Sequence, residues 1–234
     1  RFSTNNGIGS LGILYDGTEQ QKKQYLGDIA SGRKTIAFAL TEPDVGSDAS
    51  AIKTSADRQG DEFIINGRKM FITNGAIADL ITVIALTDPE KRARGGITAF
   101  IVEKGTPGFS VGRHEKKMGL RGSTTTELIF DDCHVPAINI IGGEAMIGKG
   151  FKTAMRVLDK GRLTLAAASV GMAQKALELA VSYAKERVQF GRPIGHFQLI
   201  QGMLAQMASE VFAGRQMVYR TAWEKDQGNQ IRME

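Results

Sequence analysis

The spacing of apolar residues changes once along the chain, near residue 136, and this change limits the possible folds more than any other feature. From Lys34 to Pro136 the apolar residues fall in short segments rich in Ile, Val, Phe and Thr: TIAFALT, EFIING, KMFIT, LITVIALT, ITAFIVE and TELIFDD. Such segments, separated by turn residues, are typical of strands. After residue 136, apolar residues recur at spacings of three and four, as along one face of a helix. We therefore predict a β domain followed by helices.

Turn and capping signals divide the first part of the chain further. Asn66-Gly67 lies between two strand segments and predicts a β-hairpin turn, since both central residues of that turn favour positive φ. Ahead of the β domain, Thr18 is a candidate helix cap, Gln21 lies at capping-box spacing, and Gly32 is a candidate stop. These three residues predict a short helix over residues 18–31.

Two long helices are predicted in the last third of the chain. The first carries one broad apolar face: Leu163, Ala166, Ala167, Val170, Ala173, Leu177, Ala180 and Val181. The second runs from about Gln198 to Asp226. The Gly-rich stretch IGGEAMIGKG precedes both helices and places the domain boundary near residues 137–147. Two helices cannot bury their apolar faces alone, so we expect further helices beside them.

The composition is that of an ordinary soluble globular protein, with 42% hydrophobic and 24% charged residues. No apolar stretch approaches the roughly 18–20 residues of a membrane helix, and no signal peptide is recognisable, so no membrane association is expected. Cys133 is the only cysteine, which favours a reducing compartment, either a bacterial cytoplasm or a mitochondrial matrix. The sequence opens at Arg1 without a methionine and stops at Glu234 inside a helical pattern, so we expect part of a longer protein.

Several sequence patterns suggest other functions, but the residues around them do not support those functions. The net charge of +5 raises nucleic acid as a partner, but the basic residues are spread out and not interleaved with aromatics, so none is expected. A solvated surface, or a small phosphate-bearing ligand, fits the densest basic cluster: Arg113, His114, Lys116, Lys117 and Arg121. Gly7, Gly9 and Gly12 spell a dinucleotide-binding fingerprint, yet only six residues precede Gly7, too few for the strand that this motif needs. The histidine and cysteine spacings predict no metal site.

Two strand ends carry polar residues that would suit a ligand. Thr41 ends one apolar, Phe-containing segment and Thr73 ends another, so two hydroxyls could line one flat, polar-edged ring system. In the turn after Thr41, Gly46 lets the backbone approach closely, and amide donors around Ser47 can form an anion-binding nest. In the plain structural alternative, Thr41 and Ser47 cap their own turn and Phe71 fills a core. The residues alone leave both interpretations open.

The order of five motifs resembles the acyl-CoA dehydrogenase family across essentially the entire chain: LTEPDVGSD, INGRKMFITNG, MGLRGSTTTELIFDD, LDKGRLTLAA and ERVQFGRPIGHFQLIQ. The resemblance implies a flavoprotein, usually a homotetramer, with FAD between a middle β domain and a C-terminal helical bundle. It implies an α+β fold in three parts. Residues 1–33 would be the tail of an N-terminal helical domain, residues 34–140 an antiparallel, β-barrel-like, flavin-binding domain, and residues 141–234 the first helices of an all-α bundle.

The resemblance also assigns residues to the cofactor, in three runs. The first and second runs are Phe38, Leu40, Thr41, Gly46 and Ser47, then Phe71, Ile72 and Thr73. The third, which in the family reaches the FAD of a neighbouring subunit, is Arg187, Gln189, Phe190, Phe197 and Gln198. In the family the two threonines hydrogen-bond the flavin ring. Phe71 replaces the tryptophan of many members but keeps a ring beside the flavin, and the guanidinium of Arg187 is well shaped for a pyrophosphate.

Three residues match the family's acyl-CoA site: Ser47, Asp159 and Arg162. The family's reaction needs a carboxylate base above the substrate. In the isovaleryl- and long-chain-type branches a glutamate stands immediately before this arginine, whereas this chain has Gly161. The resemblance therefore places the base beyond Glu234, and we expect no catalytic residue in the chain.

The function implied by the resemblance is oxidation of an acyl-CoA to the trans-2-enoyl-CoA, with electrons passed to an electron-transferring flavoprotein. Two alternatives remain. A same-fold acyl-CoA oxidase would give its electrons to oxygen, and a non-catalytic β module would bind a ligand or partner without chemistry. Residues 1–234 by themselves are expected to retain little FAD and to show no turnover.

Overall fold

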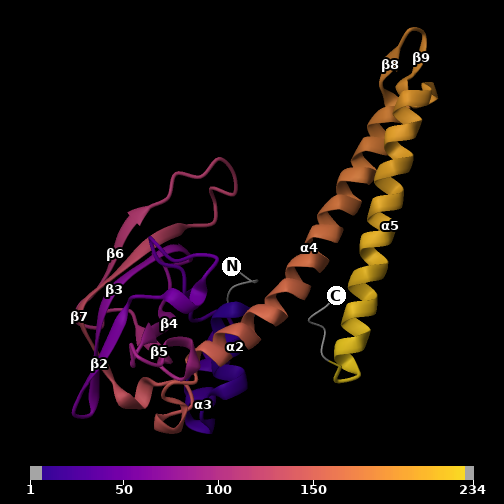
Figure 1. Ribbon diagram of the computed structural model, residues 1–234. Coiled ribbons are helices and arrows are strands. Elements are labelled where there is room, and N and C mark those ends of the chain that lie inside the picture. Colours follow the sequence, from indigo (N-terminus) through magenta and orange to yellow (C-terminus); the bar gives the residue numbers. More distant parts are fainter. Residues whose placement is uncertain (1–6, 230–234) are drawn as a thin grey trace. The chain divides into compact units, whose positions relative to one another are not determined.

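The structure, a computed structural model, describes residues 7–229 (Figure 1). Residues 1–6 and 230–234, the outermost ends of two predicted domains, lie outside the described part. The chain packs as two compact units, Arg1–Leu158 and Asp159–Glu234. Between residues 7 and 229, no helix is both long enough and apolar enough to cross a membrane.

Two helices open the first unit, α2 (Ile8–Asp16) and α3 (Glu19–Ala30). The predicted capping box is confirmed: the Thr18 hydroxyl accepts a hydrogen bond from the Gln21 amide at 3.1 Å, and Gln21 Oε1 accepts one from the Thr18 amide at 3.0 Å. Gly32 follows the helix with φ of +77°, as its role as a stop predicts. Of the glycines in the apparent dinucleotide motif, Gly7 directly precedes α2, and Gly9 and Gly12 belong to it. The helix packs on the sheet, where Thr82 donates a hydrogen bond to the Gly9 carbonyl at 3.0 Å.

Seven strands form one sheet in the first unit: β1 (Ile36–Ala39), β2 (Ser55–Gln59), β3 (Glu62–Thr73), β4 (Leu80–Leu86), β5 (Ile97–Glu103), β6 (Phe109–His114) and β7 (Thr125–Pro136). Their order is β1-β4-β2-β3-β7-β6, with β5 also paired to β4. The pairs β1–β4 and β2–β4 are parallel and the others antiparallel. The predicted α+β fold is confirmed. The domain predicted to be antiparallel and β-barrel-like is a curled sheet, which its two parallel pairs make mixed.

The predicted hairpin at Asn66-Gly67 is wrong. Strand β3 runs straight through both residues, and its register with β7 shifts between Ile65 and Gly67, which marks a β-bulge. Asn66 bridges to β7 instead, because its Oδ1 accepts a hydrogen bond from the Asp132 amide at 2.8 Å. The turn lies earlier, at residues 60–61, since Gln59 pairs with Glu62.

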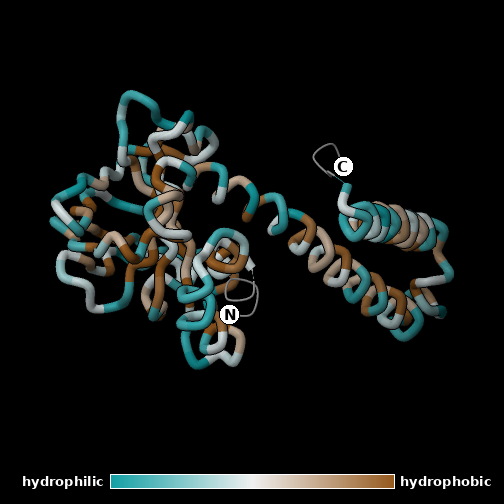
Figure 2. The backbone as a smooth tube through the Cα atoms, turned by 90° about the horizontal axis from the view of Figure 1, so that it is seen from below, coloured by the Kyte–Doolittle hydropathy of each residue, from teal (hydrophilic) through white to brown (hydrophobic). Residues whose placement is uncertain are grey.

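The sheet separates two hydrophobic cores. Successive residues of β1 alternate between them, as side chains of a strand must: Ile36 and Phe38 join one core, Ala37 and Ala39 the other. The first core includes residues of α2, α3 and the start of α4 (Gly150–Glu186), and the second lies within the curl of the sheet. The strands that line these cores are largely brown in Figure 2. All of β4 is buried, as expected for a strand covered on both faces.

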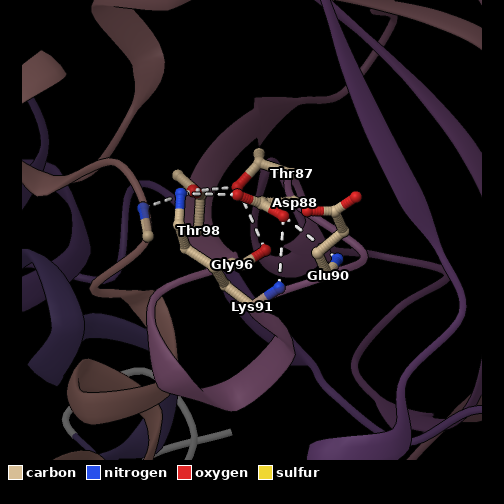
Figure 3. A network of polar contacts seen from close by, with 7 residues as sticks. Thr87, Asp88, Glu90, Lys91, Gly96 and Thr98 are labelled. Carbon is tan, nitrogen blue, oxygen red and sulfur yellow. Dashed lines mark hydrogen bonds and ion pairs between the residues drawn. The ribbon is translucent and has the colours of Figure 1, made fainter.

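A polar network fixes the loop between β4 and β5 (Figure 3). The Asp88 carboxylate accepts hydrogen bonds from the Lys91 amide and ammonium, at 3.1 and 2.7 Å. The hydroxyls of Thr87 and Thr98 are 2.8 Å apart, and Thr98 accepts a hydrogen bond from the Gly148 amide at 2.9 Å. The network thereby holds the connector that leads into α4 against β5.

The second unit is a helical hairpin. Helix α4, which begins in the first unit, continues to Glu186, a two-stranded turn follows as β8 (Val188–Gln189) and β9 (Arg192–Pro193), and α5 (Gln198–Asp226) returns. The second predicted helix is confirmed with its predicted ends. Hydropathy alternates along both helices (Figure 2), and many large apolar side chains of this unit are exposed: Leu165, Met172, Leu179, Tyr183, Met203, Phe212, Met217, Tyr219 and Trp223.

Short 3₁₀ turns complete the two units: Ala49–Ala51, Arg92–Arg94, Ala137–Asn139, Glu144–Met146 and Ile194–His196. The third and fourth of these lie in the Gly-rich connector. The compact units reflect packing within this chain and do not test where a domain of the whole protein begins. The predicted domain boundary in that connector therefore stays a prediction.

Candidate functional site

The two polar strand ends singled out in the sequence meet at one pocket in the first unit. Its volume is about 150 Å³, and it is open to solvent on one side. Its lining comes from α2, from the end of β1 and from the end of β3: Ile8, Phe38, Leu40, Thr41, Phe71, Ile72 and Thr73. Apolar side chains therefore form most of the wall, and two threonines supply hydroxyl groups.

The wall formed by β3 has an unusual backbone. The register of β3 against β7 shifts a second time between Lys69 and Ile72, and within this bulge Phe71 has a φ of +59°. Bulky residues rarely adopt positive φ, and the conformation costs of order 1–3 kcal/mol. The Phe71 side chain is 59% exposed although it is apolar. Exposure and backbone strain in one pocket residue are typical of a binding position, and they exclude the alternative in which Phe71 fills a core.

Backbone hydrogen bonds and the Asp48 carboxylate, rather than the hydroxyls of Thr41 or Ser47, stabilise the turn after β1. Glu42 and Val45 exchange two backbone hydrogen bonds, at 2.9 and 3.2 Å. The Asp48 carboxylate accepts a hydrogen bond from the Ser50 amide at 3.2 Å. The part of the chain that the structure describes shows no such bond from the hydroxyls of Thr41 or Ser47. Gly46 and Ser47 lie on an exposed bend outside the pocket lining, and their contact with a phosphate stays a prediction.

A buried ion pair lies behind the pocket wall. The Lys69 ammonium is 2.7 Å from Glu42 Oε1, and the side chains are 0% and 4% exposed. Burial lowers the pKa of Lys69 to about 8, although the nearby Glu42 opposes that shift. Burial alone would raise the pKa of Glu42, but Lys69 and backbone donors outweigh it, so that pKa lies below its usual value. Lys69 lies outside the site residues that the sequence motifs single out, and its neighbours Arg68 and Met70 do not mark it as buried.

The third predicted run gathers at the tip of the second unit. Val188 pairs with Pro193 and Gln189 with Arg192, which leaves Phe190 and Gly191 as a two-residue turn. Both have positive φ, +51° and +76°, as a type I′ turn requires. Phe190 is 92% exposed, so this turn, like the β3 bulge, combines an exposed aromatic ring with a strained backbone.

The remaining members of that run lie at the base of the same turn. Phe197 packs edge-on against Phe190, with ring centroids 6.1 Å apart, and Arg192 lies 4.6 Å from the Phe197 ring centroid. The Arg187 carbonyl accepts a hydrogen bond from the Ile194 amide at 2.8 Å, and Gln198 begins α5. Five predicted cofactor residues thus share one exposed hairpin and its flanks.

The predicted acyl-CoA residues of α4 contact each other. Arg162 forms an ion pair with Asp159 one turn earlier on the helix. In the basic cluster, Lys117 donates to the Ser123 carbonyl at 2.6 Å and Arg121 donates to the Lys117 carbonyl at 3.1 Å, so two of its cations support their own loop. Among residues 7–229, no group of three or more His, Cys, Asp or Glu side chains is arranged to hold a metal ion.

The curled mixed sheet and the helices packed on it define an α+β protein. Comparison with protein families makes the class specific: residues 37–133 match the acyl-CoA dehydrogenase middle domain, and residues 148–234 match the acyl-CoA dehydrogenase C-terminal domain. The chain belongs to the acyl-CoA dehydrogenase family.

Individual relatives agree with that assignment. An acyl-CoA dehydrogenase of Bacillus subtilis (strain 168) is 51% identical over 221 residues, which are 94% of this chain and 57% of the relative. The structure of butyryl-CoA dehydrogenase from Megasphaera elsdenii has a TM-score of 0.88 and 48% identity, covering 94% of this chain and 56% of that one. An acyl-CoA dehydrogenase complexed with FAD, from Bacillus anthracis, has a TM-score of 0.85 and 45% identity, covering 92% and 36%. The chain spans little more than half the length of the curated relatives it matches.

Proposed function

We propose that this chain is part of an FAD-dependent acyl-CoA dehydrogenase, which converts an acyl-CoA thioester to the trans-2-enoyl-CoA. The observation that carries the proposal is the pocket at which two separate sequence runs meet, in a chain that belongs to this family. Four apolar side chains from the two runs and two threonine hydroxyls are a suitable lining for a flat ring with polar edges. The relative that was solved with FAD supports that choice of ring.

The residues present fit FAD, and each has a distinct task. When bound, FAD would accept the hydride that leaves the β carbon of the thioester. Thr41 and Thr73 would donate hydrogen bonds to the ring, which favours electron uptake, and Phe71 would offer its exposed aromatic face. Amides near Ser47 would hold phosphate oxygens. The proton on the α carbon would go to a base that we place beyond Glu234, so this chain orients the reactants and does not remove the proton.

The partners follow from the same proposal. Ser47, Asp159 and Arg162 would contact the acyl-CoA, and the hairpin that carries Arg187 and Phe190 would contact the FAD of a neighbouring subunit in a homotetramer. An electron-transferring flavoprotein would receive the electrons. We place the protein in a bacterial cytoplasm or a mitochondrial matrix.

The test uses the full-length protein. We expect it to be purified yellow, to be bleached by acyl-CoA without oxygen, and to pass electrons to an electron-transferring flavoprotein without peroxide formation. Peroxide as the main product would favour the oxidase alternative, and a colourless protein that cannot be loaded with FAD would favour the non-catalytic module. The double variant Thr41→Val/Thr73→Val should fold but lose most of its FAD on gel filtration. Thr106→Val, a half-buried threonine whose hydroxyl donates to the Glu103 carbonyl at 2.7 Å, controls for the loss of a threonine hydroxyl elsewhere in the unit.

Replacing Phe190 with asparagine should separate stability from cofactor binding. Asparagine adopts positive φ more readily than phenylalanine, a gain of about 1 kcal/mol, but it loses the edge-on contact with Phe197, so the stability of the hairpin should change by less than about 1 kcal/mol. If Phe190 contacts FAD, the same variant should bind FAD at least several-fold more weakly. Thermal unfolding of the apoprotein and FAD titration measure the two effects. Val188→Asn, at an exposed position of the same hairpin, is the control, and unchanged FAD affinity in Phe190→Asn would remove that residue from the proposed site.

A further inference from the structure

The buried ion pair of Lys69 and Glu42 has more hydrogen bonds than a simple charge pair needs. Lys69 Nζ donates to Glu42 Oε1 at 2.7 Å and to the Leu40 carbonyl at 3.1 Å. Glu42 Oε1 also accepts from the Thr54 amide at 3.0 Å, and its Oε2 accepts from the Lys53 amide at 2.7 Å. A buried ion pair adds little to stability compared with apolar residues of similar volume, so the reason for this one must be sought in the arrangement that it fixes.

The pair joins three backbone segments at a single point. Leu40 and Glu42 belong to the chain that leaves β1, and Lys53 and Thr54 lead into β2. Lys69 lies on β3 where the second bulge begins. Each segment is attached through a backbone atom or a buried side chain, so moving one of them would leave a charged or polar group without its partner in the interior.

Both polar walls of the pocket lie next to this point. Leu40 and Thr41 precede Glu42 directly, while Phe71 follows Lys69 within the bulge and Thr73 lies just beyond it. A backbone hydrogen bond, from the Met70 amide to the Thr41 carbonyl at 2.8 Å, joins the walls at the same level. The positive φ of Phe71 is a conformation that its own backbone disfavours, so it persists only if its surroundings impose it.

We propose that Lys69 and Glu42 are positioning residues that set the spacing of Thr41 and Thr73 and hold Phe71 in its strained conformation. Neither residue lines the pocket. The inference rests on the proposed function, because it predicts an effect on bound flavin. If the threonines hydrogen-bond the flavin ring, then loosening their spacing weakens bonds that stabilise the reduced ring. The reduction potential of the flavin should therefore depend on a pair that lies behind the wall.

The test compares two double variants of the full-length holoenzyme. Lys69→Met/Glu42→Gln removes the buried pair without leaving a lone charge. Lys53→Met/Asp44→Asn is the matched control. It removes an exposed ion pair, with Lys53 Nζ 3.0 Å from Asp44 Oδ2, from the loop that also carries Glu42. Redox titration should show the flavin of the first variant about tenfold harder to reduce, which for a two-electron couple is about 30 mV lower. In the same variant, kcat should fall by a larger factor than the KM for acyl-CoA changes, and the visible circular dichroism of the flavin should change. The control variant should match the wild type in all of these measurements.

A milder variant covers the case in which the first double variant does not yield folded holoenzyme. Glu42→Asp keeps both charges but withdraws the carboxylate by one methylene, and should lower the potential in the same direction by a smaller amount. The inference is overturned if these variants fold, bind FAD and keep the wild-type potential and circular dichroism, because the pair would then be only structural. Failure of the wild type to bind FAD would instead refute the proposed function, so the two failures are distinguishable.

Discussion

Replacing Gln21 with leucine should destabilise the first unit by roughly 3–6 kcal/mol: about 1–3 kcal/mol for the buried Ile140 carbonyl, and about 1 kcal/mol for each of the three part-buried backbone groups that also lose their partner. The Gln21 side chain uses all four of its hydrogen-bonding positions. Its Nε2 donates to the carbonyls of Ile138 and Ile140, at 3.0 and 2.7 Å, and its Oε1 accepts from the Thr18 and Gly142 amides, each at 3.0 Å. Leucine has similar size but can satisfy none of the four.

Urea denaturation of wild type and variant measures this effect. Gln24→Leu, the same change at an exposed position of α3, is the control and should alter the free energy of unfolding by no more than about 0.5 kcal/mol. Equal effects of the two substitutions would mean that Gln21 acts only through helix propensity and that its bonds to residues 138–142 contribute nothing.

Replacing Gly150 with alanine should cost about 2–4 kcal/mol, because the first residue of α4 lies directly on β5. A Cβ there would lie 2.4 Å from the Ala99 amide nitrogen and 2.7 Å from the Thr98 Cα, and both are backbone atoms that cannot rotate away. The helix would have to move off the strand, and with it the buried side chains of Ala154 and Val157.

The control uses the same substitution where space is free. Gly27 is an exposed residue of α3, and no atom lies within 4 Å of a Cβ built there. Gly27→Ala should therefore stabilise the protein by about 0.5–1 kcal/mol, the usual gain in helix propensity. Thermal unfolding should thus show changes of opposite sign for two Gly→Ala variants, and a loss of less than about 1 kcal/mol in Gly150→Ala would contradict the close packing of α4 on β5.

The sequence correctly predicted those secondary-structure elements whose ends depend on residues close together in the chain. The capping box of α3 and the ends of α5 depend on residues within a few positions of each other, and both are confirmed. Asn66-Gly67 shows the limit of this approach. The dipeptide favours a hairpin turn in isolation, but Asn66 bonds to Asp132 and Gly67 lies against Thr54, and these distant partners make it a bulge.

The candidate site, too, could be predicted only in part from the sequence. The sequence motifs identified both pocket walls, since Thr41 and Thr73 each end an apolar segment, and the structure brings them together. Neither the strained backbone of Phe71 nor the pairing of Lys69 with Glu42 has a local signal. Both arise because β3 bulges where it passes the end of β1, a meeting of segments that no single window of sequence contains.

The hydrogen bonds of Gln21 also have a consequence for synthesis. They span 117 to 121 residues of chain, and Asp16 on α2 bonds to Thr153, 137 residues away. At ribosomal rates of about 5–20 residues per second, α3 therefore waits roughly 6–24 seconds for these partners to be made. During that interval the apolar faces of α2 and α3 lack the later strands that cover them in the folded unit, so we expect a chaperone to bind this segment of the nascent chain.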